Sequence, residues 1–213
     1  MDARVIIVTP DTVGPVKNGG VGTACFHYAR SLANAGAEID LLFTGLLEAE
    51  ETAYWRKWYA GMGIRFLTMH DMPTRPKFAY GTHWYTDRSY RIFKFLEGCN
   101  YDYVLFQDWH ANGLWSIRAK KMGYALHQTT LGVISHSPNA WQKAGMKSFG
   151  ESPLNEADLE WCERAAIEDA DVLVSPSHHM IKWLQDHKYL LPKNIAICPY
   201  TNEDEVVSGK PDA

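Results

Sequence analysis

Residues 17–23 read Lys17-Asn18-Gly19-Gly20-Val21-Gly22-Thr23. The stretch lies between an apolar run at residues 5–8 and a segment of helical period at residues 24–33. A strand, a glycine-rich turn and a helix in this order form a site for an anion, because glycine lets the backbone approach closely and the helix N-terminus presents unpaired N–H groups. A tight turn between a closely packed strand and helix also selects glycine. The stretch therefore predicts either a phosphate-binding loop or a structural turn, and in both cases a strand followed by a helix.

Apolar stretches of strand length alternate with longer stretches of helical period along the rest of the chain. This alternation indicates βαβ units, which build a mainly parallel sheet with helices on both faces. We therefore predict an α/β fold with one doubly wound, mainly parallel sheet of about seven strands. The strands are expected at residues 4–9, 39–44, 64–69, 102–107, 130–135, 172–175 and 195–197, and the helices at 20–35, 48–61, 82–97, 112–121, 155–168 and 177–186.

Length and composition restrict the class of protein. The 213 residues suffice for one large α/β domain, and the net charge of -4 does not favour a nucleic-acid partner. The four cysteines are scattered without a CxxC pair, which favours reduced thiols in a cytoplasmic protein over a disulfide framework or a zinc site. We find neither a signal-peptide pattern nor an apolar run of membrane-spanning length. The expectation is a cytoplasmic protein without a transmembrane segment.

Polar residues gather directly after four of the predicted strands. Besides the glycine-rich stretch, they are residues 108–112, 136–139 and 176–179. In a doubly wound sheet, ligands bind beyond the carboxyl ends of the strands, near the point where the strand order reverses. Asp108 would either cap the following helix or accept hydrogen bonds from a hydroxylated ligand. His136 would either be a structural partner in its loop or donate a hydrogen bond to an oxyanion or a sugar hydroxyl.

The residues do not match the common nucleotide or metal motifs. A dinucleotide-binding loop needs GxGxxG directly after the strand, whereas this chain has GGxG after a long spacer, so NAD binding is disfavoured. A P-loop is excluded because no GK[ST] follows the glycines. Asp108 and His110 lack further ligands at the spacing that a closed metal site needs, so we expect no metal.

Four segments, taken in order, resemble motifs of one enzyme family. Residues 17–22 resemble the K-x-G-G-L-G loop of starch and bacterial glycogen synthases, and residues 107–111 are similar to their H-D-W-H-A segment, with Gln107 in place of the first His. Residues 133–137 match the strand-to-loop segment that carries a His in that family, and residues 174–177 resemble its V-S-P-S/T motif. Over nearly its whole length, the chain thus resembles the N-terminal half of a GT-B glycosyltransferase of the family 4-like group.

The resemblance implies a reaction and a set of site residues. A sugar would pass from a nucleotide-sugar donor to a carbohydrate or other hydroxylated acceptor, with retention of anomeric configuration and without a metal or other cofactor. Gly19 and Gly20, assisted by Lys17, would face the donor diphosphate or the transferred sugar. As catalytic groups, His136 would contact that sugar near the reaction centre and Asp108 would bind hydroxyls. The residues expected to bind the acceptor are Trp109, His110 and Trp141.

Two segments are expected to form walls of the acceptor cleft, at residues 71–81 and 139–153. Trp84 lies near the first segment, and Trp141 lies within the second. Either indole could stack on a sugar, although core packing is the favoured role of each.

The second domain of that family, which holds the nucleotide and a pair of glutamates, has no counterpart in these 213 residues. We expect residues 1–200 to form the Rossmann-like N-terminal, acceptor-side domain, and residues 201–213 to form a linker toward the absent C-terminal donor domain. The chain alone is then expected not to transfer sugar. Two other interpretations stay open: a non-catalytic glycan-binding or scaffolding module of GT-B ancestry, and a nucleotide-binding oxidoreductase, which would bind NAD tightly.

Overall fold

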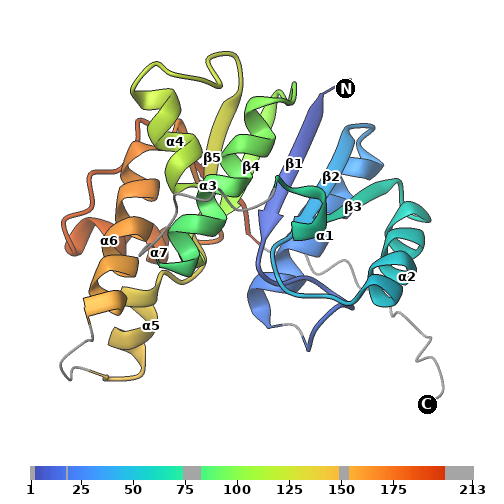
Figure 1. Cartoon of the computed structure of the whole chain (residues 1–213). Coiled ribbons are helices and arrows are strands. Elements are labelled where there is room, and N and C mark those ends of the chain that lie inside the picture. Colours follow the sequence, from blue (N-terminus) through green and yellow to red (C-terminus); the bar gives the residue numbers. More distant parts are fainter. Residues whose placement is uncertain (1–2, 18, 74–82, 149–153, 200–213) are drawn as a thin grey trace.

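A parallel sheet of seven strands lies at the centre of the computed structural model, which describes residues 3–17, 19–73, 83–148 and 154–199 (Figure 1). The strands are β1 (Arg4–Thr9), β2 (Glu38–Phe43), β3 (Ile64–Thr68), β4 (Tyr103–Gln107), β5 (Thr130–Ile134), β6 (Val172–Ser175) and β7 (Asn194–Ile197). Their order is β3-β2-β1-β4-β5-β6-β7, and each neighbouring pair is parallel. The chain therefore builds the sheet outward from β1 to β3, returns beside β1 with β4, and continues outward to β7.

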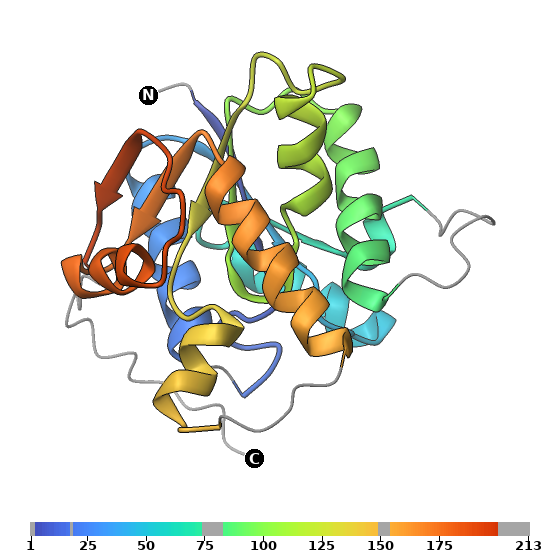
Figure 2. The same ribbon diagram turned by 90° about the vertical axis from the view of Figure 1, so that its left-hand side faces the viewer.

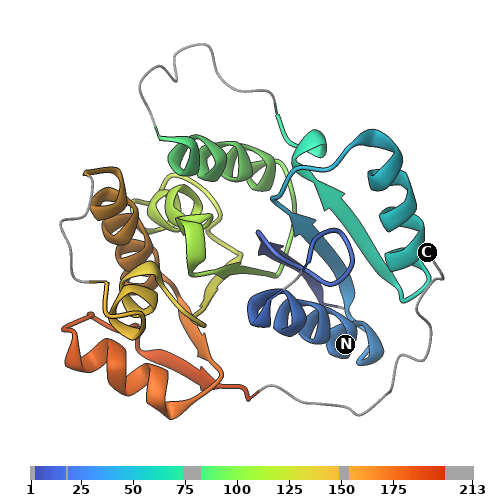
Figure 3. The ribbon, with the colours of Figure 1, turned by 90° about the horizontal axis from the view of Figure 1, so that it is seen from below.

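Helices cover both faces of the sheet. They are α1 (Gly20–Asn34), α2 (Ala49–Ala60), α3 (Trp84–Glu97), α4 (Leu114–Lys121), α5 (Asn139–Gly145), α6 (Leu154–Asp169) and α7 (His178–Asp186). Ile6 and Val8 of β1 pack in a cluster with residues of α3, α4, α6 and α7, whereas Val5 and Ile7 pack with residues of α1 and α2. Figure 3 shows α1 and α3 on opposite sides of the strands. The predicted doubly wound α/β fold is confirmed, with β1 apolar toward both layers as a buried parallel strand requires.

The first strand–helix unit follows the prediction closely. β1 occupies the predicted residues, and α1 begins at Gly20 and ends at Asn34. Gly36, two residues beyond the end of this helix, has a φ of 84°, a left-handed conformation that glycine adopts without strain. None of the described helices is both long and apolar enough to cross a membrane.

Helix α5 is a feature that the sequence analysis did not predict. It begins directly after Pro138, within a segment expected only to form a wall of the acceptor cleft. A helix of 7 residues, none of them buried, shows too little apolar periodicity to be recognised. Figure 2 shows α5 beside the lower end of α6, which it contacts. Our expectations for residues 74–82, 149–153 and 201–213 fall outside the described residues.

Candidate functional site

The four polar segments lie side by side along one edge of the sheet. They follow β1, β4, β5 and β6, which are neighbours in that order. Because the strands are all parallel, their carboxyl ends meet at the same edge. The strand order reverses between β1 and β4, which is where ligands bind in doubly wound sheets.

The glycine-rich loop is closed on a carboxylate of its own chain. Asp11 Oδ2 accepts hydrogen bonds from the backbone N–H of Gly19 at 2.8 Å and of Gly22 at 3.2 Å. These bonds satisfy two N–H groups at the start of α1 internally, as the structural-turn interpretation requires. Gly20, however, is exposed, and a Cβ added there would meet no atom of the described residues within 4 Å. Asp11 is not among the predicted site residues, although a carboxylate in the loop between β1 and the glycines is a signal in the sequence.

Gly22→Ala should disturb this closure, and Gly20→Ala is its matched control. A Cβ at Gly22 would lie 2.5 Å from Asp11 Oδ1, so the carboxylate has to move and release its backbone donors. We expect the free energy of unfolding to fall by about 1–2 kcal/mol in Gly22→Ala, and to stay level or rise by about 0.5 kcal/mol in Gly20→Ala. Urea unfolding followed by circular dichroism measures both. Equal stability of the two variants would show that Asp11 does not hold the loop.

Asp108 is a buried bridge between the loops that follow β4 and β5. Its side chain is 1% exposed. Oδ2 accepts hydrogen bonds from Ser135 Oγ at 2.9 Å and from the backbone N–H of Ser137 at 3.1 Å, and Oδ1 accepts one from the N–H of Trp109 at 2.8 Å. Burial raises the pKa of this carboxyl to about 7, although the donors around it act in the opposite direction. Asp108 therefore fixes the residues on either side of His136.

Glu163 of α6 forms a second bridge between the same loops. Its Oε1 accepts a hydrogen bond from the backbone N–H of His110 at 2.9 Å, and its Oε2 accepts one from that of Asn139 at 2.7 Å. The side chain is 1% exposed, and burial raises its pKa to about 8. The sequence analysis missed this residue because it is one of several acids on α6; the signal was its place beside Cys162 and before Ala165, on the buried face.

The two raised pKa values make stability fall as the pH rises. Each carboxyl binds its proton more tightly in the folded than in the unfolded state, so its contribution is fully present below the ordinary pKa and is lost through about pH 7 for Asp108 and about pH 8 for Glu163. Below about pH 6.5 the lowered pKa values of His110 and His136 act in the opposite direction, because these imidazoles bind protons more tightly in the unfolded state. We therefore expect the free energy of unfolding to decrease between about pH 6.5 and 8 in urea titrations. Glu163→Gln, which removes one of the two groups, should flatten the decrease. A stability that rises over this interval would contradict the prediction.

His136 is buried just beyond β5 and next to α1. Burial lowers its pKa to about 4, so the imidazole is neutral at physiological pH. The ring of Tyr28, from α1, lies 6.5 Å away between centroids. The Tyr28 hydroxyl donates a hydrogen bond to the carbonyl oxygen of Cys198 at 2.8 Å, which joins α1 to the chain that leaves β7. The imidazole is thus enclosed between the first helix and the two loops that Asp108 connects.

An aromatic group surrounds His110 in the loop after β4. His110 has a φ of 68°, and its ring stacks on Trp109 at 3.8 Å between centroids. The indole of Trp84, at the start of α3, stands perpendicular to the imidazole at 4.8 Å. Burial, with a smaller contribution from nearby Arg88, lowers the pKa of His110 to about 3. A non-glycine residue in the left-handed conformation, held by its neighbours, is typical of functional loops.

Trp84 and Trp141, which we expected in the core, differ in how far their side chains are buried. Trp84 is 54% exposed, so the expectation of core packing is wrong for it. From the first position of α3, its side chain contacts His110 and Arg88 instead. Trp141 of α5 is half-buried and packs against the larger hydrophobic cluster, as expected.

Lys17, Gly19 and Gly20 are all exposed beside the start of α1. Among the described residues, no three His, Cys, Asp or Glu side chains are grouped to hold a metal ion.

Comparison with known proteins gives a family and a fold. A family model described as Glycosyltransferase Family 4 matches residues 18–200 of the chain. No curated protein matches the sequence. The structure of TcCGT1 in complex with UDP is 9% identical in sequence with a TM-score of 0.60, and the match covers 99% of this chain and 54% of that one. The catalytic domain of starch synthase IV from Arabidopsis thaliana, bound to ADP and acarbose, is 12% identical with a TM-score of 0.55, over 93% of this chain and 52% of that one.

The structural likeness at these identities is one of fold alone. An uncharacterized sugar kinase from Pyrococcus horikoshii is also similar, with 10% identity and a TM-score of 0.52, over 88% of this chain and 67% of that one. The present chain spans about half the length of TcCGT1 and of the starch synthase domain.

Proposed function

Because the chain belongs to glycosyltransferase family 4, we propose that it forms the acceptor-side half of a retaining glycosyltransferase. A sugar passes from a nucleotide-sugar donor to a hydroxylated acceptor at the carboxyl edge of the sheet. The acceptor contacts the loops after β4 and β5, and the donor diphosphate approaches the exposed beginning of α1. Residues 1–200 are the acceptor-side domain, and residues 201–213 are a linker toward a C-terminal domain that holds the nucleotide.

The pair of buried bridging carboxylates is the observation that carries the proposal. Asp108 and Glu163 each bind backbone groups of the loop after β4 and of the loop after β5. Taking a carboxylate out of water costs free energy, even when donors compensate for part of it. Two such groups at one place support a role in which the positions of His110 and His136 matter to within a fraction of an ångström, as in catalysis.

For each candidate residue at the carboxyl edge of the sheet, we infer a role in sugar transfer from the contacts and burial of its side chain. His136, which is neutral, donates a hydrogen bond to the transferred sugar near the reaction centre. Asp108 is enclosed behind it, and we assign it the positioning of the His136 loop in place of direct contact with hydroxyls. Lys17 and the open backbone at Gly20 stabilise the charge that develops on the leaving diphosphate. Transfer needs no metal in this scheme.

Sugar transfer by the complete native gene product, assayed beside residues 1–213 alone, tests the proposal. Each protein is incubated with a panel of nucleotide-sugars and hydroxylated acceptors, with and without EDTA, and products are analysed by NMR. We expect transfer with retained configuration from the gene product, unchanged by EDTA, and none from the 213 residues. Loss of transfer in EDTA would contradict metal independence. Glycan binding without turnover would indicate a non-catalytic module, and tight NAD binding an oxidoreductase.

A further inference from the structure

Among the residues that the structure describes, Arg88 of α3 has no carboxylate partner. Its Nη1 donates a long hydrogen bond of 3.5 Å to the carbonyl oxygen of Thr44, and its Cζ lies 4.7 Å from the ring centroid of Trp84. Its Nε and Nη2 are buried and have no hydrogen-bond partner in the described part of the chain. Burial alone lowers the pKa of this guanidinium to about 10, and no neighbouring acid offsets the effect.

Other arginines of the chain are satisfied by the protein. Arg65 pairs with Asp40, and Arg118 pairs with Asp169 at 3.0 Å. Arg91, one turn along α3 from Arg88, donates to two backbone carbonyls at 2.8 and 2.9 Å. A guanidinium with two buried nitrogens whose N–H groups are unused is costly to keep, because protein contacts do not compensate for their removal from water. The contrast points to a partner that comes from outside the chain.

Two further buried polar atoms, which have no hydrogen-bond partner among the described residues, lie next to Arg88. One is Oγ1 of Thr44, which follows β2, and the other is Nδ1 of His110, which follows β4. Thr44 accepts the long bond from Arg88, and both the imidazole of His110 and the guanidinium lie within 5 Å of the same Trp84 ring. Since β1 lies between β2 and β4, the three groups meet over the end of β1, where the strand order reverses.

We propose that Arg88, with Thr44 and His110, binds an anionic group of the acceptor, which is therefore a hydroxylated compound that carries a phosphate or a carboxylate. The proposal rests on the proposed function, because it places this group in the acceptor site. The planar fork of an arginine matches the oxygens of either anion with two parallel hydrogen bonds, and a hydroxyl and a neutral imidazole add donors beside it. Trp84, more than half exposed, covers the guanidinium, and its indole moves aside when the anion enters.

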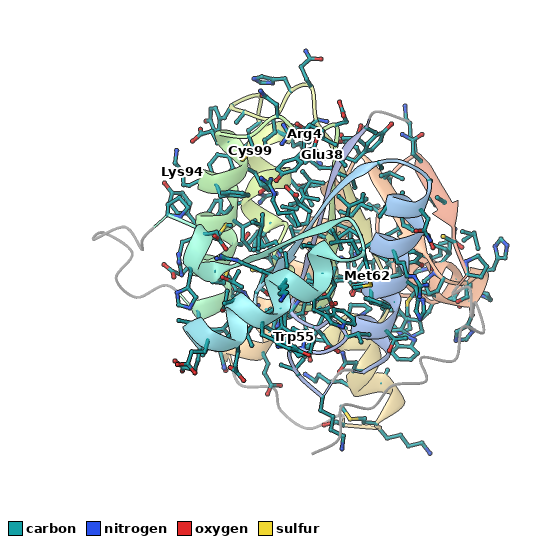
Figure 4. The ribbon with its side chains drawn as sticks, turned by 90° about the vertical axis from the view of Figure 1, so that its right-hand side faces the viewer. Arg4, Glu38, Trp55, Met62, Lys94 and Cys99 are labelled. Atoms are coloured by element: carbon teal, nitrogen blue, oxygen red, sulfur yellow. The ribbon has the colours of Figure 1, made fainter. Side chains whose placement is uncertain are left out.

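The test measures binding without turnover, with four probes and three variants. The probes are inorganic phosphate, glucose 6-phosphate, glucuronate and glucose, titrated into the 213-residue chain by NMR or calorimetry. The variants are Arg88→Met, Arg88→Lys, and Lys94→Gln as the control that removes a cation from the exposed side of the same helix (Figure 4). We expect glucose 6-phosphate or glucuronate, whichever anion the site takes, to bind at least about 10-fold tighter than glucose. Arg88→Met should abolish this difference, Arg88→Lys should weaken it, and Lys94→Gln should keep it.

The thermal stability of Arg88→Met separates a ligand-binding arginine from a structural one. Removal of an uncompensated buried charge should leave Tm unchanged or raise it, whereas a structural arginine would lower it. The inference is overturned if Arg88→Met binds the anion as tightly as the parent chain does. It is also overturned if Arg88→Met has a lowered Tm without any loss of anion affinity. If the complete gene product glycosylates neutral acceptors and Arg88→Met does not change kcat/KM, the inference fails while the proposed function stands. If Arg88-dependent anion binding occurs but no donor supports transfer, the proposed function fails instead.

Discussion

His136→Ala should lower kcat of the complete gene product by about 100- to 1,000-fold, the effect of removing one positioned hydrogen-bond donor from a site that excludes water. His136 lies beyond the carboxyl end of β5 and is 8% exposed, so it has little contact with water before substrate binds. Because burial lowers its pKa to about 4, the loss of activity should be constant between pH 6 and 8. Steady-state kinetics over that range measure it.

His127→Ala provides the matched control for this variant. His127 is exposed and precedes β5, so it lies at the opposite edge of the sheet from His136. We expect its kcat to equal that of the parent protein, and we expect both variants to keep the parent Tm within a few degrees. A kcat of His136→Ala within about 3-fold of the parent value would show that His136 is a loop residue without a catalytic role, since a single lost donor costs far more than that.

Asp108→Asn should strongly destabilise the fold. Both carboxylate oxygens accept a backbone N–H, from Trp109 to Oδ1 and from Ser137 to Oδ2. The amide of asparagine offers only one acceptor, so its NH₂ group faces a backbone donor in either orientation. We expect the free energy of unfolding to fall by about 2–4 kcal/mol, the range for a buried donor left without its charged partner.

The measurement is best made at pH 8, where the Asp108 carboxyl, with a pKa of about 7, is mostly ionised. Asp102→Asn is the control, because Asp102 precedes β4 at the opposite edge, is exposed, and accepts one hydrogen bond from the N–H of Arg4 at 2.8 Å. A change of less than about 0.5 kcal/mol in Asp102→Asn is expected for an exposed site. If Asp108→Asn were equally mild, the bridge between the two loops would not depend on the charge.

The sheet could be predicted from the sequence because its signals are local. Each strand is an apolar run, and the predicted bounds of β1 and β6 coincide with those of the structure. The α5 helix could not be predicted, because its 7 residues, which directly follow a proline, show too little apolar periodicity to indicate a helix. Predicted boundaries elsewhere differ by one or two residues, as helix and strand ends commonly do.

The candidate site was predicted only in part, because half of it depends on contacts between distant residues. Strand ends drew attention to Asp108 and His136, which follow apolar runs directly. Glu163 reaches a backbone amide 53 residues away, and its place on the buried face of α6 shows that it is enclosed but not which groups it binds. Arg88 is notable because two of its nitrogens have no hydrogen-bond partner among the described residues. Only the three-dimensional arrangement of α3 and its neighbours can reveal this.

The hydrogen bond from Tyr28 to the carbonyl oxygen of Cys198 has a mechanical consequence. Tyr28 belongs to α1, whose first turn carries the glycine-rich loop, and Cys198 follows β7 at the far side of the sheet. A pull on the chain beyond Cys198 is therefore transmitted to α1 as well as to β7. The helix that begins at the glycine-rich loop and the chain that leaves β7 are thus tied to each other by a direct contact as well as through the sheet.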